Sequence, residues 1–271
     1  MHFSKWQGCG NDVIIINGLG EELPDASAFA KQYSDRRFGI GFDQMLIVKP
    51  SGSADFKMLI MNADGSEVEM CGNGIRCFAK YLHREGLTSK KSLVIETLGG
   101  VIKPKIEGEL VVVDMGEPIL NPQDIPVNLD QRAIELPQNF ADTTLKITCV
   151  SMGNPHCVIF LEDIQNFPVT VLGPIIEHHP LFPKRTNVEF AQALDPHTLK
   201  VRVWERGTGE TYACGTGACA TLVAGVLTGH SEREATLQLK GGDLKIQWNE
   251  TDNHVYMTGP AVFVYDGVLD V

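Results

Sequence analysis

The 271-residue sequence lacks the long apolar runs of secreted and membrane-spanning chains. Residues 1–6 hold no apolar segment of a signal peptide, and the first apolar run, residues 13–16, is far shorter than the ~20 residues that span a bilayer. Basic residues are also scarce: 23 Lys and Arg stand against 34 Asp and Glu, for a net charge of −11. This charge argues against a surface for nucleic acid or for an anionic membrane. We therefore expect a cytoplasmic protein that binds neither.

The cysteines lack the spacing of a disulfide framework or of a metal site. There are seven, an odd number, and no two of them form a C-x-x-C pair. Such usage is typical of reduced thiols in a reducing compartment. His178 and His179 are adjacent, but no carboxylate or thiol stands at ligand spacing from them, so we interpret them as loop residues and expect no metal.

The sequence contains two similar stretches, each around a cysteine. Residues 71–74 read Cys-Gly-Asn-Gly, and residues 214–217 read Cys-Gly-Thr-Gly. Each is followed by a run with helical spacing that stops at a glycine, Gly86 or Gly229. We therefore predict that each cysteine lies at the N-terminus of a helix. Free backbone N–H groups and partial positive charge there lower a thiol pKa and hold an anion.

The sequence repeats itself once at long range. The two cysteines are 143 residues apart (214 − 71 = 143), and other residues recur at the same offset: Gly10-Asn11 with Gly153-Asn154, Gln44 with Asn187, and Asn62 with Glu205. This offset is too long for a solenoid, and a length of 271 residues also favours two domains. We predict two similar domains, residues 1–117 with 262–271 and residues 118–261, each contributing one thiol.

The expected elements favour an α+β fold. Hydrophobic content of 43% and charged content of 21% are ordinary for a globular chain. Short apolar segments bounded by turn residues come in runs and do not alternate with helices, which predicts about six or more strands and one dominant helix in each copy. The tail, residues 261–271, reads as one more strand, which we expect to return to the sheet of the first domain.

Two thiols related by symmetry suit proton transfer on opposite faces of one carbon. A thiolate removes the proton, the opposite thiol returns one, and the configuration inverts; a thiol pKa of ~8.5 can be brought near the working pH. The backbone N–H groups of Gly72-Asn73 and Gly215-Thr216 are placed to stabilise the carboxylate of an amino-acid carbanion. His156 and Glu205 are the candidates for carrying thiol protons.

The motifs resemble those of a known family. E-M-C-G-N-G-I-R-C and W-E-R-G-T-G-E-T-x-A-C-G-T-G, together with G-N-D and G-N-P-H, are similar to the motifs of diaminopimelate epimerases over nearly the whole chain. The resemblance implies an enzyme without a cofactor that interconverts LL- and meso-2,6-diaminopimelate by a two-base mechanism, for lysine and cell-wall synthesis. It further implies two pseudo-symmetric domains, each a barrel-like mixed or antiparallel sheet around a central helix, and a homodimer.

The resemblance also assigns roles to residues of this chain. Cys71 and Cys214 become the acid and base, assisted by His156 and Glu205. Gly72, Asn73, Gly215 and Thr216 hold the reacting carboxylate. The residues assigned to the distal amino-acid end of the substrate are Asn62, Asn154, Asn187 and Arg206, together with Glu205. Asn11 and Gln44 are assigned to the lining of the pocket. Tyr265 matches a position near the dimer contact.

Other functions stay open on the residues alone. A proline or hydroxyproline racemase shares the two-thiol plan but not the E-R-G-T-G-E-T loop. A thiol redox or metal-binding protein would carry close cysteine pairs, and a binding protein for a dicarboxylic amino acid would leave the α-proton in place. A pyridoxal-phosphate racemase would need a lysine, and neither motif contains one. The remaining cysteines are interpreted as packed side chains: Cys9, Cys77, Cys149, Cys157 and Cys219.

Overall fold

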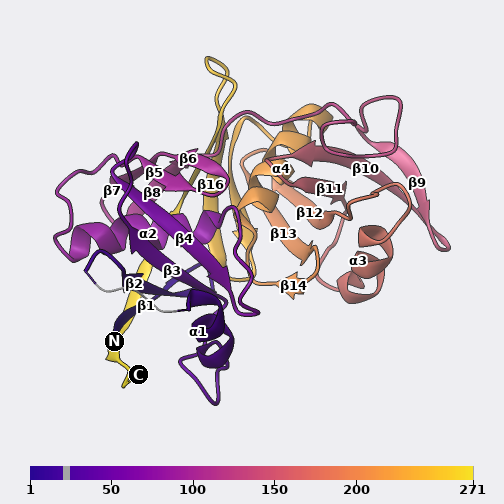
Figure 1. Cartoon of the computed structure of the whole chain (residues 1–271). Helices are drawn as coiled ribbons and strands as arrows, with labels where there is room; N and C mark the ends of the chain where they lie inside the picture. The colour runs from indigo at the N-terminus through magenta and orange to yellow at the C-terminus, as the bar shows by residue number, and fades with distance from the viewer. Residues whose placement is uncertain (21–24, 271) are drawn as a thin grey trace. The chain divides into compact units, whose positions relative to one another are not determined.

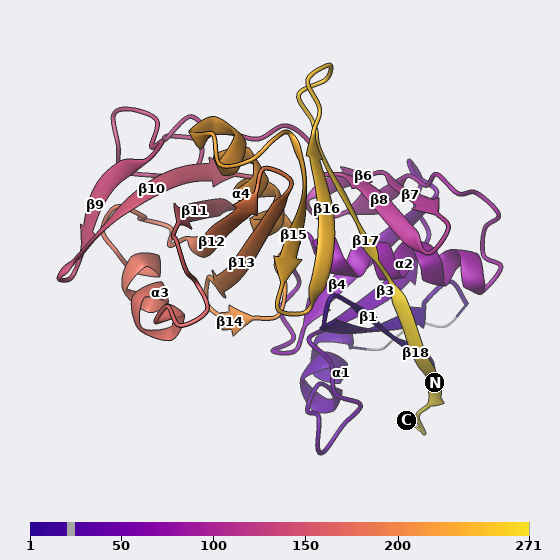
Figure 2. The same ribbon diagram turned by 180° about the vertical axis from the view of Figure 1, so that it is seen from behind.

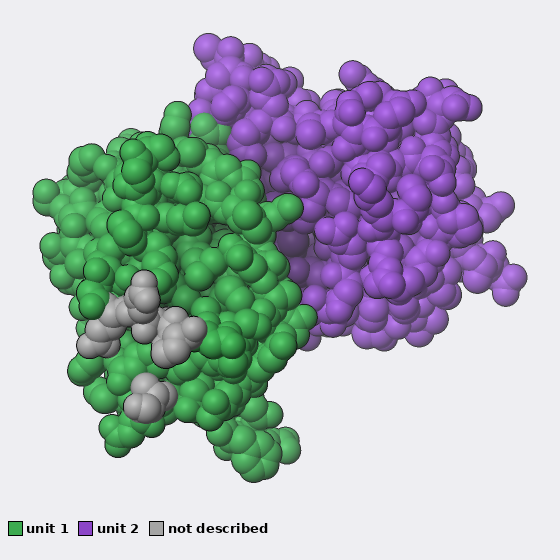
Figure 3. All heavy atoms as spheres, in the orientation of Figure 1, with its two compact units in different colours: residues 1–114, 258–271 green, residues 115–257 purple. Residues whose placement is uncertain are grey.

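The computed structural model describes residues 1–20 and 25–270, which fall into two compact units (Figures 1 and 3). Unit 1 comprises Met1–Asp114 and Thr258–Val271, and unit 2 comprises Met115–Met257. Val271, the last residue of the strand and of the domain expected at the C-terminus, lies outside the described residues. No helix in the described part of the chain is long and apolar enough to cross a membrane.

Unit 1 is built on a seven-stranded mixed sheet with the order β18-β1-β2-β3-β4-β5-β6. An antiparallel hairpin, β7 (Pro104–Glu107) and β8 (Leu110–Asp114), follows β6 in the chain and is not part of this seven-stranded sheet. The strands of the sheet are β1 (His2–Gly8), β2 (Asn11–Asn17), β3 (Gln44–Lys49), β4 (Phe56–Asn62), β5 (Ile95–Thr97), β6 (Gly100–Ile102) and β18 (Val262–Val268).

Unit 2 contains the neighbouring strands β16-β15-β13-β12-β11-β10-β9, with β14 paired to β13. Their bounds are β9 (Leu136–Phe140), β10 (Thr143–Ser151), β11 (Pro155–Phe160), β12 (Asn187–Asp195), β13 (Thr198–Glu205), β14 (Gly209–Thr211), β15 (Glu234–Leu239) and β16 (Gly242–Trp248). Strand β17 (Val255–Pro260) carries the chain from unit 2 back to unit 1.

The two units repeat one pattern of strand pairing, which confirms the duplication. In unit 1 the pairs from β1 to β6 alternate antiparallel, parallel, antiparallel, parallel, antiparallel. In unit 2 the series β10, β11, β12, β13, β15, β16 alternates in the same way. The expectation of α+β units with mixed sheets is therefore confirmed. The sheets are open, however: each has two end strands and does not close into a barrel.

The helices also occupy corresponding positions. Helices α1 (Ala26–Tyr33) and α3 (Val169–Glu177) follow the second strand of each series, and α2 (Gly72–Arg84) and α4 (Gly215–Thr228) follow the fourth. Helix α2 packs on β1, β2 and β3, and α4 packs on β10 to β13 and on β16. Helix α4 ends as predicted, at Gly229, whose φ of 75° is a left-handed conformation that favours glycine.

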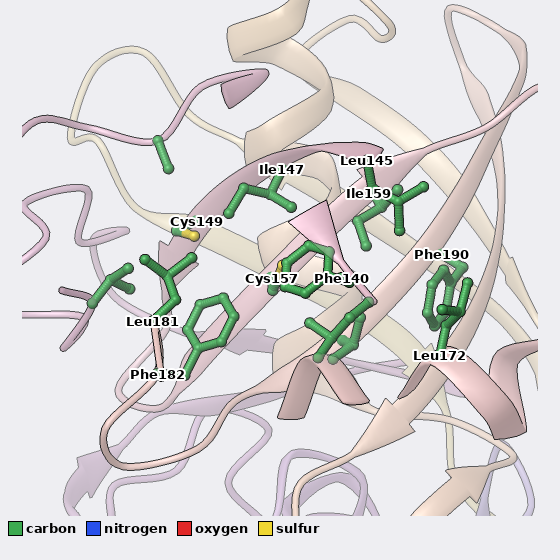
Figure 4. Packing of buried hydrophobic residues seen from close by; sticks show 14 of the residues in the cluster. Phe140, Leu145, Ile147, Cys149, Cys157, Ile159, Leu172, Leu181, Phe182 and Phe190 are labelled. Atoms are coloured by element: carbon green, nitrogen blue, oxygen red, sulfur yellow. The ribbon is translucent and has the colours of Figure 1, made fainter. Parts of the chain in front are cut away.

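A second apolar layer covers the other side of each sheet. In unit 1, side chains of α1 such as Phe29 join Ile14, Ile16 and Met45 of the sheet. In unit 2 the layer joins α3 to the sheet, and Figure 4 shows it around Phe140, Phe182 and Phe190. Cys149 and Cys157 belong to this layer and are buried, which confirms their interpretation as packed side chains.

The tail returns to unit 1 as expected. Strand β18 pairs antiparallel with β1, from His2 opposite Val268 to Gln7 opposite Val262. The first and last described residues lie side by side in both ribbon views (Figures 1 and 2), and the backbone of Met1 bonds to that of Leu269. Because β18 is an end strand of the sheet, one of its edges has no partner strand among the described residues of unit 1.

Candidate active site

Cys71 is the N-cap residue of α2. Its Sγ accepts a hydrogen bond from the backbone N–H of Gly74 at 3.1 Å, and its thiol donates to Oδ1 of Asn11 at 3.6 Å. The extended backbone of Cys71 and the glycine three residues later produce this cap, because a Cβ on Gly74 would lie 2.9 Å from Sγ. The predicted position of this thiol at a helix N-terminus is therefore confirmed.

The amide of Asn11 is oriented by a carboxylate that the sequence analysis did not identify. Nδ2 of Asn11 donates to Oδ2 of Asp43 at 3.0 Å, so Oδ1 is left to face Cys71. Arg36 bridges Asp43 and Asp12, and Lys5 pairs with Asp12 as well. Burial raises the pKa of Asp12, but the hydrogen bond and charge of Lys5 and the charge of Arg36 outweigh it and hold the pKa below its usual value.

Gln44 and Asn62 lie directly opposite each other on β3 and β4. Nε2 of Gln44 donates to Oδ1 of Asn62 at 3.0 Å, and Asn62 donates in turn to Ser66. Oε1 of Gln44 is buried and has no hydrogen-bond partner among the described residues. A buried amide oxygen of this kind is an acceptor suited to a ligand donor such as an ammonium group.

Arg76 is a fully buried guanidinium on the second turn of α2. It donates from Nη1 to the carbonyl of Gly72 at 3.2 Å and from Nε to that of Pro260 at 3.0 Å. A Cβ on Gly8 would lie 3.0 Å from Nη2 and 3.2 Å from the carbonyl oxygen of Asn73. The glycine of β1 therefore gives room for this arginine under the turn that carries Gly72 and Asn73.

Cys214 occupies the same position on α4. Its Sγ accepts from the backbone N–H of Gly217 at 3.3 Å and lies 3.4 Å from Oγ1 of Thr216. The expectation of a lowered thiol pKa is wrong for this cysteine. Burial, followed by the negative charges of Glu205 and Glu189, raises the pKa well above its usual value, and the bonds from Thr216 and Gly217 do not compensate.

Glu205 is the last residue of β13, and Arg206 begins the turn that follows it. Thr211 donates to Oε1 of Glu205 at 2.5 Å, and the backbone N–H of Arg206 donates to Oδ1 of Asn187 at 2.9 Å. Nδ2 of Asn187 donates to the carbonyl of Pro155, so both ends of this amide bind backbone. Glu177 of α3, which the sequence analysis missed, accepts from Trp204 at 2.8 Å and from the N–H of Gly207 at 2.9 Å.

His156 lies on β11 with both ring nitrogens against side-chain oxygens. Nδ1 is 2.8 Å from Oε1 of Glu189, and Nε2 is 2.9 Å from Oδ1 of Asn154. Both His156 and Glu189 are completely buried. The sequence analysis missed Glu189, although an acid between Val188 and Phe190 in an apolar strand was a signal.

The structure thus gathers the predicted residues into two sets, one in each unit. In unit 1, Asn11 contacts Cys71, and Gln44 contacts Asn62. In unit 2, Asn154 contacts His156, and Asn187 holds the turn of Glu205 and Arg206. Tyr265 lies elsewhere, on β18, with its ring edge-on to Phe3. Among the described residues no group of three or more His, Cys, Asp or Glu is placed to hold a metal ion.

In chemical terms, each set offers a thiol at the N-terminus of a helix, where the helix dipole is positive. This arrangement places an acid or base next to donors for an anion. Amide and carboxylate groups around the thiols provide donors and acceptors for a polar ligand with both ammonium and carboxylate ends.

Comparison with known proteins identifies relatives along the full chain. The family model described as diaminopimelate epimerase matches residues 3–121 and 148–264. A diaminopimelate epimerase of Acetivibrio thermocellus is 53% identical and covers 100% of this chain and 99% of its own. Those of Moorella thermoacetica and Methanococcus maripaludis are 53% and 48% identical, with coverage of 98% and 100% of both chains.

Solved structures of more distant proteins share the fold. A phenazine biosynthesis protein of the PhzF family from Bacillus anthracis aligns with a TM-score of 0.71 at 19% identity, over 100% of this chain and 99% of its own. A probable proline racemase from Agrobacterium radiobacter aligns with a TM-score of 0.70 at 12% identity, over 100% and 93%. With near 50% identity to its curated relatives over their whole length, the chain belongs to the diaminopimelate epimerase family.

Proposed function

We propose that this protein interconverts LL- and meso-2,6-diaminopimelate by proton transfer between the substrate α-carbon and two thiols, those of Cys71 and Cys214. The observation that carries the proposal is the matched position of the two cysteines. Each is the N-cap of the helix that follows the fourth strand of its series, and each accepts an N–H bond from a glycine three residues on. The two duplicated units are thus proposed as the two halves of one epimerase.

The proposed reaction needs no cofactor. One cysteine, as thiolate, takes the α-proton, and the electron pair of the C–H bond is delocalised into the substrate carboxylate. The other cysteine, as thiol, gives its proton to the opposite face of the carbon and becomes the thiolate. Backbone N–H groups of Gly72, Asn73, Gly215 and Thr216 stabilise the charge that develops on the carboxylate.

We assign the rest of the substrate to the polar residues of the two sets. Arg206 suits the distal carboxylate because a guanidinium can bind it through two hydrogen bonds. Gln44 and Glu205 carry acceptors for the distal ammonium group, and Asn11, Asn62, Asn154 and Asn187 complete the polar lining. His156 and Glu205 are proposed to carry protons to and from the thiols.

The test is proton NMR of LL-diaminopimelate with the purified, reduced protein in D2O, with no cofactor added. The proposal predicts loss of the α-proton signal together with appearance of the meso isomer. Turnover of proline in place of diaminopimelate would favour a racemase instead, and binding without exchange would favour a binding protein. A requirement for added pyridoxal phosphate would contradict the thiol mechanism.

We further propose a homodimer formed through β18. Five large apolar side chains on this end strand are exposed: Val262, Phe263, Val264, Tyr265 and Val268. An unpaired apolar edge is a site for pairing with a second chain, and two copies of one strand can pair antiparallel about a twofold axis. Light scattering should give a dimer mass for the wild type and a monomer mass for Val264→Asp. A monomeric wild type would contradict this part. We also propose a cytoplasmic location, because the proposed substrate is a precursor for lysine and cell-wall synthesis.

A further inference from the structure

Glu189 is a buried carboxylate whose position on β12 aims it at helix α4. Side chains alternate along a strand, so the neighbours of Glu189, Val188 and Phe190, point the other way into the apolar layer beneath α3. Glu189 itself is completely buried. An ionised carboxylate is costly to bury, and packing alone gives no reason for an acid at this position.

Three observations describe the surroundings of the Glu189 carboxylate. Oε1 is 2.8 Å from Nδ1 of His156. A Cβ on Gly217 would lie 2.6 Å from the same Oε1, so the carboxylate is packed against the first turn of α4, at the residue whose N–H binds the thiol of Cys214. Oε2 is buried and has no hydrogen-bond partner in the described part of the chain.

We propose that Glu189 is a positioning residue for the reaction: it fixes the ring of His156 and holds a negative charge against the helix turn that carries Cys214. The inference rests on the proposed role of Cys214 as an acid and base. If the carboxylate accepts a hydrogen bond from Nδ1, the hydrogen-bond role of Nε2 toward Asn154 is determined as well. A neutral ring then accepts at Nε2, and a protonated ring donates from both nitrogens.

The charges around Cys214 give the inference a measurable consequence. The charges of Glu205, at the end of β13, and of Glu189, on β12, act on the thiol, and Glu189 is bound to His156 of β11. Thr216 and Gly217 of α4 contact the thiol. After burial, the two carboxylates are what raise the pKa of Cys214. Removing the charge of Glu189 should therefore let the thiol ionise at lower pH.

The experiment uses Glu189→Gln in the full chain. The rate of alkylation of Cys214 by iodoacetamide is measured against pH without substrate, and the modified peptide is identified by mass spectrometry. The midpoint of the alkylation profile of Cys214 should move about one pH unit lower, because one nearby negative charge is lost. At a fixed pH below the midpoint, this shift corresponds to about tenfold faster alkylation. The kcat for diaminopimelate should fall about tenfold or more with little change in KM, because Glu189 is completely buried and is proposed to act on His156 and Cys214, not on the substrate.

Two further variants separate positioning from general loss of structure. Glu177→Gln removes another buried carboxylate of unit 2, one bound to Trp204 and Gly207, and should leave the alkylation midpoint of Cys214 at the wild-type value. Glu189→Asp keeps the charge but shortens the reach to His156, so kcat should fall while the midpoint stays near wild type. If Glu189→Gln does not fold, the kcat of Glu189→Asp tests whether Glu189 positions His156.

The inference is overturned by a wild-type midpoint or a wild-type kcat in Glu189→Gln, or by wild-type turnover in Glu189→Asp. Failure of the proposed function would look different. In that case the wild type itself would convert no diaminopimelate, whereas the alkylation profile, recorded without substrate, would still report whether Glu189 acts on Cys214.

Discussion

Replacement of Gly217 by alanine tests the packing at the second thiol. The added Cβ would lie 2.6 Å from Oε1 of Glu189, 3.2 Å from Cβ of Cys214 and 3.3 Å from its Sγ. Real Cβ atoms do not approach an oxygen this closely, so the carboxylate must move. It is completely buried and bound to His156, so movement breaks the 2.8 Å contact between Oε1 and Nδ1.

The expected cost follows from three terms. Overpacking costs about 1–3 kcal/mol, and a lost hydrogen bond to a charged group costs about 1.5–3 kcal/mol. Alanine in place of glycine in a helix stabilises the folded state by at most about 1 kcal/mol. Gly217→Ala should therefore reduce the free energy of unfolding of unit 2 by about 2–5 kcal/mol. It should also slow turnover, because His156 and the cap of Cys214 are both displaced.

Denaturant unfolding followed by circular dichroism measures the stability, and a double-mutant cycle identifies the cause. In a Glu189→Ala background the clash is gone, so the same Gly217→Ala change should cost much less. Gly52→Ala is the control, because its Cβ would meet nothing within 4 Å. An equal cost of Gly217→Ala with and without the Glu189 side chain would refute the reasoning.

Three more predictions concern carboxylates. Asp43→Ala should lower kcat about tenfold or more by freeing the amide of Asn11 to turn, and steady-state kinetics should show no such loss if the orientation is unimportant. The pKa of Asp12 is lowered on folding, so its interactions stabilise the protein above pH ~4 and are lost as the pH falls through the folded pKa. The stability difference between wild type and Asp12→Asn, from denaturant melts, should therefore shrink at acidic pH and not grow. Glu177→Gln should raise KM more than it lowers kcat, because the turn it holds is proposed to bind the distal end of the substrate; a pure kcat effect would contradict that assignment.

Much of the fold was predictable because the sequence holds two copies of one pattern. Glycine-rich turns before apolar helical runs located α2 and α4 and their N-cap cysteines. Helix α3 was missed, since Pro174 lies inside it and residue 168, its N-cap, is also a proline. Strand β9 was missed because its sequence, LPQNF, contains a proline and two amides, which are typical of a linker. The barrel-like shape of the sheets was expected from the resemblance alone; the strand pairing gives mixed sheets, as expected, which do not close into barrels.

The residues of the candidate site that recur in both copies of the repeat were predictable from the sequence. The residues that hold those side chains in place were not. Cys71 and Cys214 stand in matched motifs, so their place at helix starts followed from the sequence. Asp43 contacts Asn11, and Glu189 contacts His156, between segments that are distant in the sequence, so neither contact could be predicted from local sequence. The pKa of Cys214 was wrongly expected to be low, because the helix N-terminus is local whereas burial and neighbouring carboxylates depend on the fold.

The central claim is that two thiols act on opposite faces of one carbon. Its most direct test is α-proton exchange in D2O by Cys71→Ala and Cys214→Ala, measured separately from LL- and from meso-diaminopimelate by proton NMR. The account predicts that neither variant converts one isomer into the other, and that any remaining exchange belongs to opposite isomers in the two variants. Near-normal conversion by either variant, or exchange of the same isomer by both, would contradict it.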